Sequence, residues 1–277
     1  MSGPETIKLF LPLGNAKRLR TVDISNWTGA AIAAPRSDLD QFLSRQELTK
    51  PGIYILLGAD PKDGKLSAYI GEAEDVSNRV KQHKQKDFWN TAIAIVSKDE
   101  YLTKSHVRYL EGRLIEVAGK IGRYKLLNTQ ISGSKLPESD KSDMEVFLER
   151  VIQLFPVLGS DLLTPIAVKE QVIFKCKMKS AKATGQRTPN GFVVFKGSTA
   201  VLKDRASAKK QGPWTIKLRG RLREDGTLVE KNGLLNFTKD TEFASPSAAA
   251  AVIHGGTAAG PLAWKTDDGR TLKKIEG

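Results

Sequence analysis

The chain has 277 residues, of which 40% are hydrophobic and 27% charged, and this argues against disorder and for a folded protein with more than one domain. No stretch approaches the ~20 apolar residues that span a bilayer, and the first residues lack the pattern of a secretory signal. We therefore expect a cytoplasmic protein with no membrane partner. A single cysteine, Cys176, excludes an internal disulfide and a cysteine-based metal site.

The positive charge is concentrated in the last part of the chain. Residues 165–277 hold 21 Lys and Arg against 10 Asp and Glu, a net +11, whereas residues 1–164 hold 23 against 21, a net +2. A basic surface attracts nucleic-acid phosphates, with an affinity that falls as salt rises. The alternative is a solvated face that only keeps the protein soluble.

Residues 1–49 predict an N-terminal segment of one β-hairpin and one short helix. Residues 6–10 and 19–25 have strand composition and flank a Gly-Asn turn signal at residues 14 and 15. Residues 26–29 close this hairpin, and Ser37 is the expected N-cap of a helix over residues 37–45. We find no residues with chemical function in this segment.

Residues 50–135 predict two strands, a helix, a strand and a second helix. The first two strands, residues 53–57 and 67–71, flank a turn-rich segment, Gly58–Gly64, and form a hairpin with a long loop. The elements that follow are a helix over residues 75–85, a strand over 91–97 and a helix over 103–118 with Thr103 as N-cap.

Residues 136–190 predict one helix and a linker. A capping box, Ser142 to Glu145, begins a helix whose apolar face is Met144, Phe147, Leu148, Val151, Ile152 and Phe155. Residues 176–190 are polar, cationic and free of aromatic side chains, so we expect an exposed basic linker there. A second, small α+β domain is then expected over residues 191–277.

The expected helix over residues 75–85 carries a cation and an imidazole on one face. Arg79 and His83 are four residues apart and therefore stack on the same side, while Val76 and Val80 anchor the helix to the core. Phosphodiester hydrolysis needs such groups, because a cation offsets charge in the transition state and a titratable group moves protons.

Glu111 falls inside the apolar stripe of its predicted helix, between Val107 and Leu114. A buried carboxylate is costly unless it is paired or binds a metal. One interpretation of Glu111 is a structural ion pair with Arg79 or Arg113, and the other is a metal ligand. His106 and His254 have no metal-type partners nearby in the sequence and are expected to be structural.

Two triplets at the start of the paired strands, Gly52-Ile53-Tyr54 and Tyr69-Ile70-Gly71, together with Arg79, His83, Glu111 and Asn128, resemble the GIY-YIG nuclease family. The resemblance covers about residues 50–130 and implies an α+β domain in which helices flank a small mixed or antiparallel sheet. The segment between the triplets is longer than is usual in the family, which affects the loop shape and the approach of substrate.

The resemblance also implies roles for six residues. Tyr54 would be the general base and Tyr69 its hydrogen-bond partner, since an isolated tyrosine with a pKa near ~10 needs a neighbouring charge or partner to act as a base. Arg79, His83 and Asn128 would complete the catalytic group. Glu111 would hold a single Mg²⁺ or Mn²⁺ ion.

The C-terminal residues include a helix over 245–252, with Ser245 as N-cap and Pro246 at its first position, followed by Gly255-Gly256, Gly260 and Trp264. A strand and turn are expected from Phe192, and a strand over residues 219–223. This part resembles the small domain of unknown function that often follows GIY-YIG domains. Trp264 and Trp214 are expected to be core anchors, base stacking being the alternative.

The sequence therefore predicts a metal-dependent endonuclease that hydrolyses phosphodiester bonds in DNA. The alternative is a non-catalytic DNA-binding or DNA-sensing protein that uses the nuclease fold as a platform. The expected partner is DNA, with single-stranded and branched forms among the candidates. DNA specificity, biological role and oligomeric state do not follow from the sequence.

Overall fold

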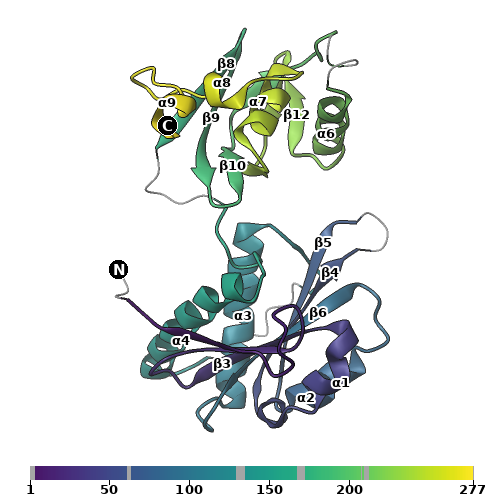
Figure 1. The fold of residues 1–277 in the computed structure, drawn as a ribbon, viewed down its shortest axis with the longest axis vertical. Helices are drawn as coiled ribbons and strands as arrows, with labels where there is room; N and C mark the ends of the chain where they lie inside the picture. The colour runs from purple at the N-terminus through teal and green to yellow at the C-terminus, as the bar shows by residue number, and fades with distance from the viewer. Residues whose placement is uncertain are drawn as a thin grey trace. The chain divides into compact units, whose positions relative to one another are not determined.

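The computed structural model describes residues 4–60, 64–128, 135–166, 172–206, 208 and 212–276. The chain forms two compact units, Met1–Thr164 and Pro165–Gly277, and each contains both sheet and helices (Figure 1). The predicted α+β class is therefore confirmed. Within the described residues, no helix has the length and apolar character needed to cross a membrane.

The first unit is built on one sheet with the strand order β1-β2-β3-β6-β4-β5-β7. All neighbouring strands are antiparallel except β5 and β7, which are parallel. The strands are β1 (Ile7–Phe10), β2 (Arg20–Ile24), β3 (Gly29–Pro35), β4 (Gly52–Ala59), β5 (Leu66–Ala73), β6 (Trp89–Ser97) and β7 (Lys125–Leu126). The two predicted hairpins, β1-β2 and β4-β5, are both present, although residues 61–63 of the second turn lie outside the described residues.

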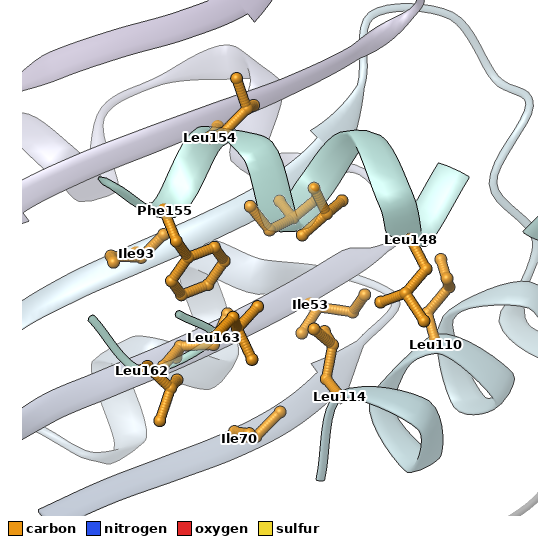
Figure 2. Packing of buried hydrophobic residues seen from close by; sticks show 14 of the residues in the cluster. Ile53, Ile70, Ile93, Leu110, Leu114, Leu148, Leu154, Phe155, Leu162 and Leu163 are labelled. Carbon is orange, nitrogen blue, oxygen red and sulfur yellow. The ribbon is translucent and has the colours of Figure 1, made fainter. Parts of the chain in front are cut away.

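One face of this sheet packs on two long helices, α3 (Lys104–Ile121) and α4 (Glu138–Val157). Figure 2 shows Leu110 and Leu114 of α3 and Phe155 of α4 beside Ile53 and Ile70 of the sheet. The other face packs on the short helices α1 (Leu39–Leu43) and α2 (Val76–Gln82). Because successive side chains of a strand point to opposite faces, each triplet sends its isoleucine toward α3 and its tyrosine toward α2.

Three predictions for the first unit need correction. Residues 26–29 do not close the sheet, because after a turn at Asn26 (φ 62°) the chain continues into the buried strand β3. The helix expected over 37–45 is a 3-10 turn, Arg36–Asp38, followed by α1, so Ser37 is not its N-cap. Helix α4 begins at Glu138, which places the expected capping box inside the helix.

The second unit contains a four-stranded sheet, β14-β10-β9-β8, and a three-stranded sheet, β11-β13-β12. The strands are β8 (Ile173–Met178), β9 (Ala181–Thr188), β10 (Gly191–Val194), β11 (Thr199–Val201), β12 (Leu228–Lys231), β13 (Leu234–Phe237) and β14 (Thr241–Phe243). The helices are α6 (Pro213–Glu224), α7 (Pro246–His254), α8 (Gly260–Ala263) and α9 (Leu272–Glu276). Helix α7 begins as predicted, with Ser245 as N-cap accepting a hydrogen bond from the Ala248 amide at 3.1 Å.

Trp264 anchors the core of the second unit, as predicted. Its side chain is fully buried, its ring centroid lies 4.3 Å from that of Phe192, and its Nε1 donates to the Pro246 carbonyl at 3.0 Å. Trp214 on α6 is different, because 46% of it is exposed. The expectation of a core role therefore holds for Trp264 but not for Trp214.

Two predictions for the second unit are wrong. The linker expected over residues 176–190 consists of β8 and β9, in which Cys176 is buried while Lys175 and Lys177 are exposed. The strand expected over residues 219–223 is part of α6, where Arg219 is 3% exposed. The unit accordingly begins at Pro165, upstream of the start expected at Gly191.

Candidate active site

Helix α2 positions Arg79 and His83 beside the sheet. The Asp75 side chain caps the helix by accepting a hydrogen bond from the Asn78 amide at 2.9 Å. Val76 and Val80 are fully buried, so they fix the helix against the sheet. Arg79 lies on the exposed side of this turn, and His83 follows directly after the last helical residue.

The structure brings Tyr54, Tyr69 and His83 together on the face of the sheet that α2 covers. The Tyr54 hydroxyl lies 3.1 Å from His83 Nε2, within hydrogen-bond distance. The ring centroids are 5.9 Å apart for Tyr54 and Tyr69, 5.4 Å for Tyr54 and His83, and 5.0 Å for Tyr69 and His83. Arg79 also lies near Tyr54, since each of the two side chains shifts the pKa of the other, so four of the six predicted residues form one cluster.

The glycines of the two triplets have steric roles at this cluster. A Cβ atom on Gly71 would lie 2.5 Å from Cζ and from the hydroxyl oxygen of Tyr54, whose ring crosses β5 there. A Cβ atom on Gly52 would lie 2.6 Å from the Ile95 carbonyl oxygen on β6. Both distances are shorter than non-bonded contacts allow, so only glycine fits at these positions.

The environment keeps Tyr54 and His83 uncharged at neutral pH. Burial raises the pKa of Tyr54, and so does the neighbouring Tyr69. Together these two effects outweigh the opposite effect of Arg79. Burial lowers the pKa of His83 to about 4, helped by the nearby charges of Lys86 and Arg79. The His83 Nδ1 atom is buried and has no hydrogen-bond partner among the residues described.

Tyr69 is the more accessible of the two tyrosines. It is half-buried, whereas Tyr54 is 1% exposed. The Lys86 ammonium lies 5.1 Å from the centre of the Tyr69 ring, in a position for a cation–π contact. A phosphate that approaches this cluster would therefore meet Lys86, Arg79 and the Tyr69 hydroxyl before Tyr54.

The two remaining predicted residues, Asn128 and Glu111, come from other elements than the four clustered side chains. Asn128 follows β7, and its side chain continues the edge of the sheet by accepting from the Ile70 amide at 3.1 Å and donating to the Ile70 carbonyl at 2.5 Å. Glu111 is 8% exposed and belongs to α3, which covers the face of the sheet opposite to α2. Arg113, one proposed partner of Glu111, forms ion pairs with Glu116 and Glu145.

Glu72, directly after the second triplet, is a further charged residue near the cluster and is not among the six predicted residues. Its carboxylate lies 3.5 Å from Arg108 Nε on α3, and its charge also raises the pKa of Arg79, after the larger effects of Tyr54 and Tyr69. The Glu72 carboxylate therefore interacts with a cation on each of the two helices, Arg108 on α3 and Arg79 on α2. Its position after the triplet was the only signal available in the sequence.

The donor set for a metal is small. Within the described parts of the chain, no group of three or more His, Cys, Asp or Glu side chains could hold a metal ion. Mg²⁺ in phosphate-processing sites is often held by one or two carboxylates, with water and substrate phosphate as the other ligands. Glu111 is one such carboxylate, and its residue is 8% exposed.

The expected structural histidines have structural contacts. His106 completes the cap of α3, where its amide donates to the Thr103 hydroxyl at 3.3 Å and its Nδ1 lies 3.4 Å from the Thr103 amide. His254 ends α7, and its Nε2 lies 3.3 Å from the sulfur of Cys176.

Comparison with known families finds a match in the second unit. Residues 174–276 match a family described as a domain of unknown function (DUF4357), and this match does not extend into residues 1–173. No curated protein and no solved structure matches the chain. The predicted C-terminal domain of unknown function is thus supported, and it includes β8 and β9.

Proposed function

We propose that the first unit is a metal-dependent endonuclease of the GIY-YIG type that hydrolyses phosphodiester bonds in DNA. The main support is the cluster in which Tyr54 is hydrogen-bonded to His83, with Tyr69 stacked alongside and Arg79 close by. These four side chains come from β4, β5, α2 and the residue that follows α2, and they meet at one place on the sheet, next to the cation of Lys86.

In this proposal Arg79 stabilises the negative charge that develops on the phosphate in the transition state. Its side chain is exposed enough to reach a phosphate, and it lies beside Tyr54. Gln82 accepts a hydrogen bond from the guanidinium at 2.8 Å and so orients it. Arg79 is thereby oriented before substrate binds, so little reorganisation is needed during the reaction.

The geometry favours Tyr69 over Tyr54 as the group that takes a proton from the attacking water. Tyr54 is buried, its hydroxyl is already bonded to His83, and its pKa is raised. Forming a tyrosinate there would be costly. We assign Tyr54 and His83 to positioning Arg79 and Tyr69, which differs from the role that the resemblance implies for Tyr54.

Glu111 would hold Mg²⁺ or Mn²⁺, and the ion would supply charge compensation at the phosphate and lower the pKa of a bound water. Asn128 uses both polar atoms of its side chain on the backbone of Ile70. Its role is therefore to hold the strand that carries Tyr69 rather than to contact DNA.

The proposal is tested by incubating the full chain with labelled single-stranded, duplex and branched DNA, with and without Mg²⁺. The Glu111→Gln variant keeps the shape of the side chain but removes its charge. We expect this variant to lose cleavage and to keep DNA binding. Wild-type cleavage by Glu111→Gln, or cleavage in the presence of a chelator, would refute the metal role of Glu111.

A DNA-binding or DNA-sensing protein without catalysis is the second candidate. It is favoured by the burial of Tyr54 and by the position of Glu111 on the helix that covers the opposite face. The same experiment separates the two functions, since this candidate binds DNA with or without Mg²⁺ and cleaves none of the substrates.

A further inference from the structure

A cavity of about 370 Å³ in the second unit lies outside the candidate active site. The turn between β8 and β9, the segment after β11 and the end of α7 line it. Its size lies in the range of small-ligand sites, which begins at roughly 300 Å³. Figure 1 labels β8, β9 and α7 among the elements of this unit.

Arg205 is held firmly in the wall of this cavity. Its amide donates to the Gly255 carbonyl at 2.7 Å, and its aliphatic carbons lie against Gly256, where a Cβ atom would be 3.2 Å from Arg205 Cδ. The guanidinium lies 3.3 Å from the sulfur of Met178 and 3.5 Å from His254 Nδ1. Both are weak or neutral acceptors, so most of its N–H donors remain available to a ligand.

The His254 side chain is a neutral part of the cavity wall, and its contacts fix its orientation. Burial lowers its pKa, and the nearby charge of Arg205 lowers it further, so the imidazole is uncharged at neutral pH. An arginine can only donate, so His254 Nδ1 is the acceptor in its contact with Arg205. The proton then lies on Nε2, which faces Cys176 at 3.3 Å.

The charge around the cavity is positive and is not neutralised by the protein. Lys179, Lys203 and Arg205 line it, and none of them has a carboxylate partner among the residues that the structure describes. The acidic lining residue is Asp204, which is engaged by Arg219 at 2.6 Å. The three cations are therefore free to attract an anion.

Arg219 fixes the shape of this wall from inside the unit. It is 3% exposed and donates to the carbonyls of Val201 at 2.6 Å and Leu202 at 3.1 Å, and also to that of Val252 on α7. It thereby joins the segment after β11 to the end of α7. The site is built before any ligand arrives.

We propose that this cavity binds a nucleotide unit, with its phosphate on Arg205 and Lys203. Phosphate is the anion that an oriented guanidinium and neighbouring ammonium groups bind best. The remaining lining includes Val201, Leu202 and Leu234, which offer an apolar surface to a base. The nucleotide belongs to a nucleic-acid strand or is free, and both sources present the same phosphate.

If the nucleotide belongs to a DNA strand, the inference rests on the proposed function and extends it, because it says where the second unit holds DNA. The test uses the full chain, a fluorescent oligothymidylate, thymidine monophosphate and inorganic phosphate. The variants are Lys203→Glu and Arg205→Gln. The control is Lys239→Glu, which makes the same charge change as Lys203→Glu but at an exposed lysine outside the cavity.

We expect Lys203→Glu and Arg205→Gln each to weaken oligothymidylate binding roughly tenfold or more, as loss of a charged phosphate contact implies. The slope of log affinity against log salt should fall by about 0.7 for each lost contact with a single strand. Lys239→Glu should retain the wild-type affinity and slope. Unfolding curves of all variants would establish that the effect is not loss of fold.

Comparison of the three ligands identifies the source of the phosphate. Binding of the oligonucleotide but not of the mononucleotide supports a strand, and equal sensitivity of mononucleotide binding to both variants supports a free nucleotide. If both variants bind every ligand like Lys239→Glu, the proposal is refuted. Cleavage at saturating DNA is measured separately, so a chain that binds through this cavity but cuts nothing refutes the nuclease and not the cavity.

Discussion

The hydrogen bond between Tyr54 and His83 joins two groups that are both neutral at pH 7. The raised pKa of Tyr54 and the lowered pKa of His83 leave neither of them charged, so the positive charge of the cluster comes from Arg79 and Lys86. Rates for single variants can therefore separate the residue that takes a proton from the residues that hold the others in place.

The first prediction concerns the two tyrosines. Tyr69→Phe should lower the single-turnover cleavage rate by about 10²–10⁴-fold, as expected for loss of a general base. Tyr54→Phe should lower the rate less, because it removes a positioning hydrogen bond. Rates at saturating DNA provide the measurement. A larger loss in Tyr54→Phe than in Tyr69→Phe would restore Tyr54 as the base.

The second prediction concerns Arg79. Arg79→Ala should remove about 2–4 kcal/mol of transition-state stabilisation, similar to the loss of one oxyanion donor. Lys81→Ala on the same helix is the control, since Lys81 is exposed and is not part of the cluster. If Arg79→Ala weakened DNA binding but left turnover at saturating DNA unchanged, Arg79 would be a binding residue only.

The third prediction concerns pH and follows from His83. The unfolded chain binds a proton at this histidine below about pH 6.5, whereas the folded chain does so only near pH 4. The contribution of neutral His83 to stability is full above pH 6.5 and is lost as the pH falls toward 4. We expect His83→Phe to lose less stability than the wild type between neutral pH and pH 5 or so, in denaturant titrations. Parallel losses in both proteins would mean that His83 titrates normally.

At the scale of the elements, β4 and β5 place the cluster by their register. Tyr54 pairs with Gly71 across the two strands, so the ring of Tyr54 lies over the residue without a side chain. Gly71→Ala should destabilise the protein by about 1–3 kcal/mol, as overpacking of a rigid core does, and should reduce cleavage.

The control for this prediction is Gly119→Ala on α3. Its added Cβ atom would make only an ordinary contact with Leu126, at 3.7 Å, and alanine favours helix by about 0.5–1 kcal/mol. Thermal unfolding of both variants gives the measurement. Equal stability of Gly71→Ala and the wild type would show that Tyr54 can move away without cost.

The elements that the sequence predicted well have strong alternation or clear caps. Strands β4, β5 and β6 and helix α3 with its Thr103 cap are where the pattern places them. Strand β3 was missed because its alanines have little strand preference. Strand β8 was missed because its exposed lysines hide a period of two, in which Phe174 and Cys176 are buried.

The candidate site was predictable only in part, for a related reason. The i, i+4 spacing of Arg79 and His83 and the buried position of Glu111 both follow from helix geometry. Which face of the sheet each helix covers depends on tertiary packing, and spacing along the chain carries no information about it. The sequence therefore could not tell that Glu111 belongs to a helix on one face of the sheet and Arg79 to a helix on the other.

At the scale of the whole molecule, the two units differ more in net charge than in fold class. The first unit carries a net +2 and the candidate active site, and the second carries a net +11 and its own core around Trp264. Affinity for DNA and cleavage of DNA are thus expected to belong to different parts of the chain.

The fifth prediction follows from this division. A chain of residues 1–164 should bind DNA more weakly than the full chain and show a shallower salt dependence, because fewer phosphates are neutralised. It should retain slow, Mg²⁺-dependent cleavage. A salt titration by fluorescence anisotropy tests this, and identical slopes for the two chains would mean that the basic unit has another partner.

The pairing of β3 with β6 also sets an order of events when the chain folds. Gly29 pairs with Ser97 and Pro35 with Thr91, so closing this contact joins segments about 60 residues apart, which costs more chain entropy than closing a shorter loop. The hairpin β4-β5 closes a much shorter loop, and its pairing with β6 also joins segments that are closer in sequence. We expect the three strands that carry or support the cluster to assemble first and the N-terminal strands to add late. Substitutions in β3, such as Ile32→Val, should then speed unfolding and leave the folding rate nearly unchanged.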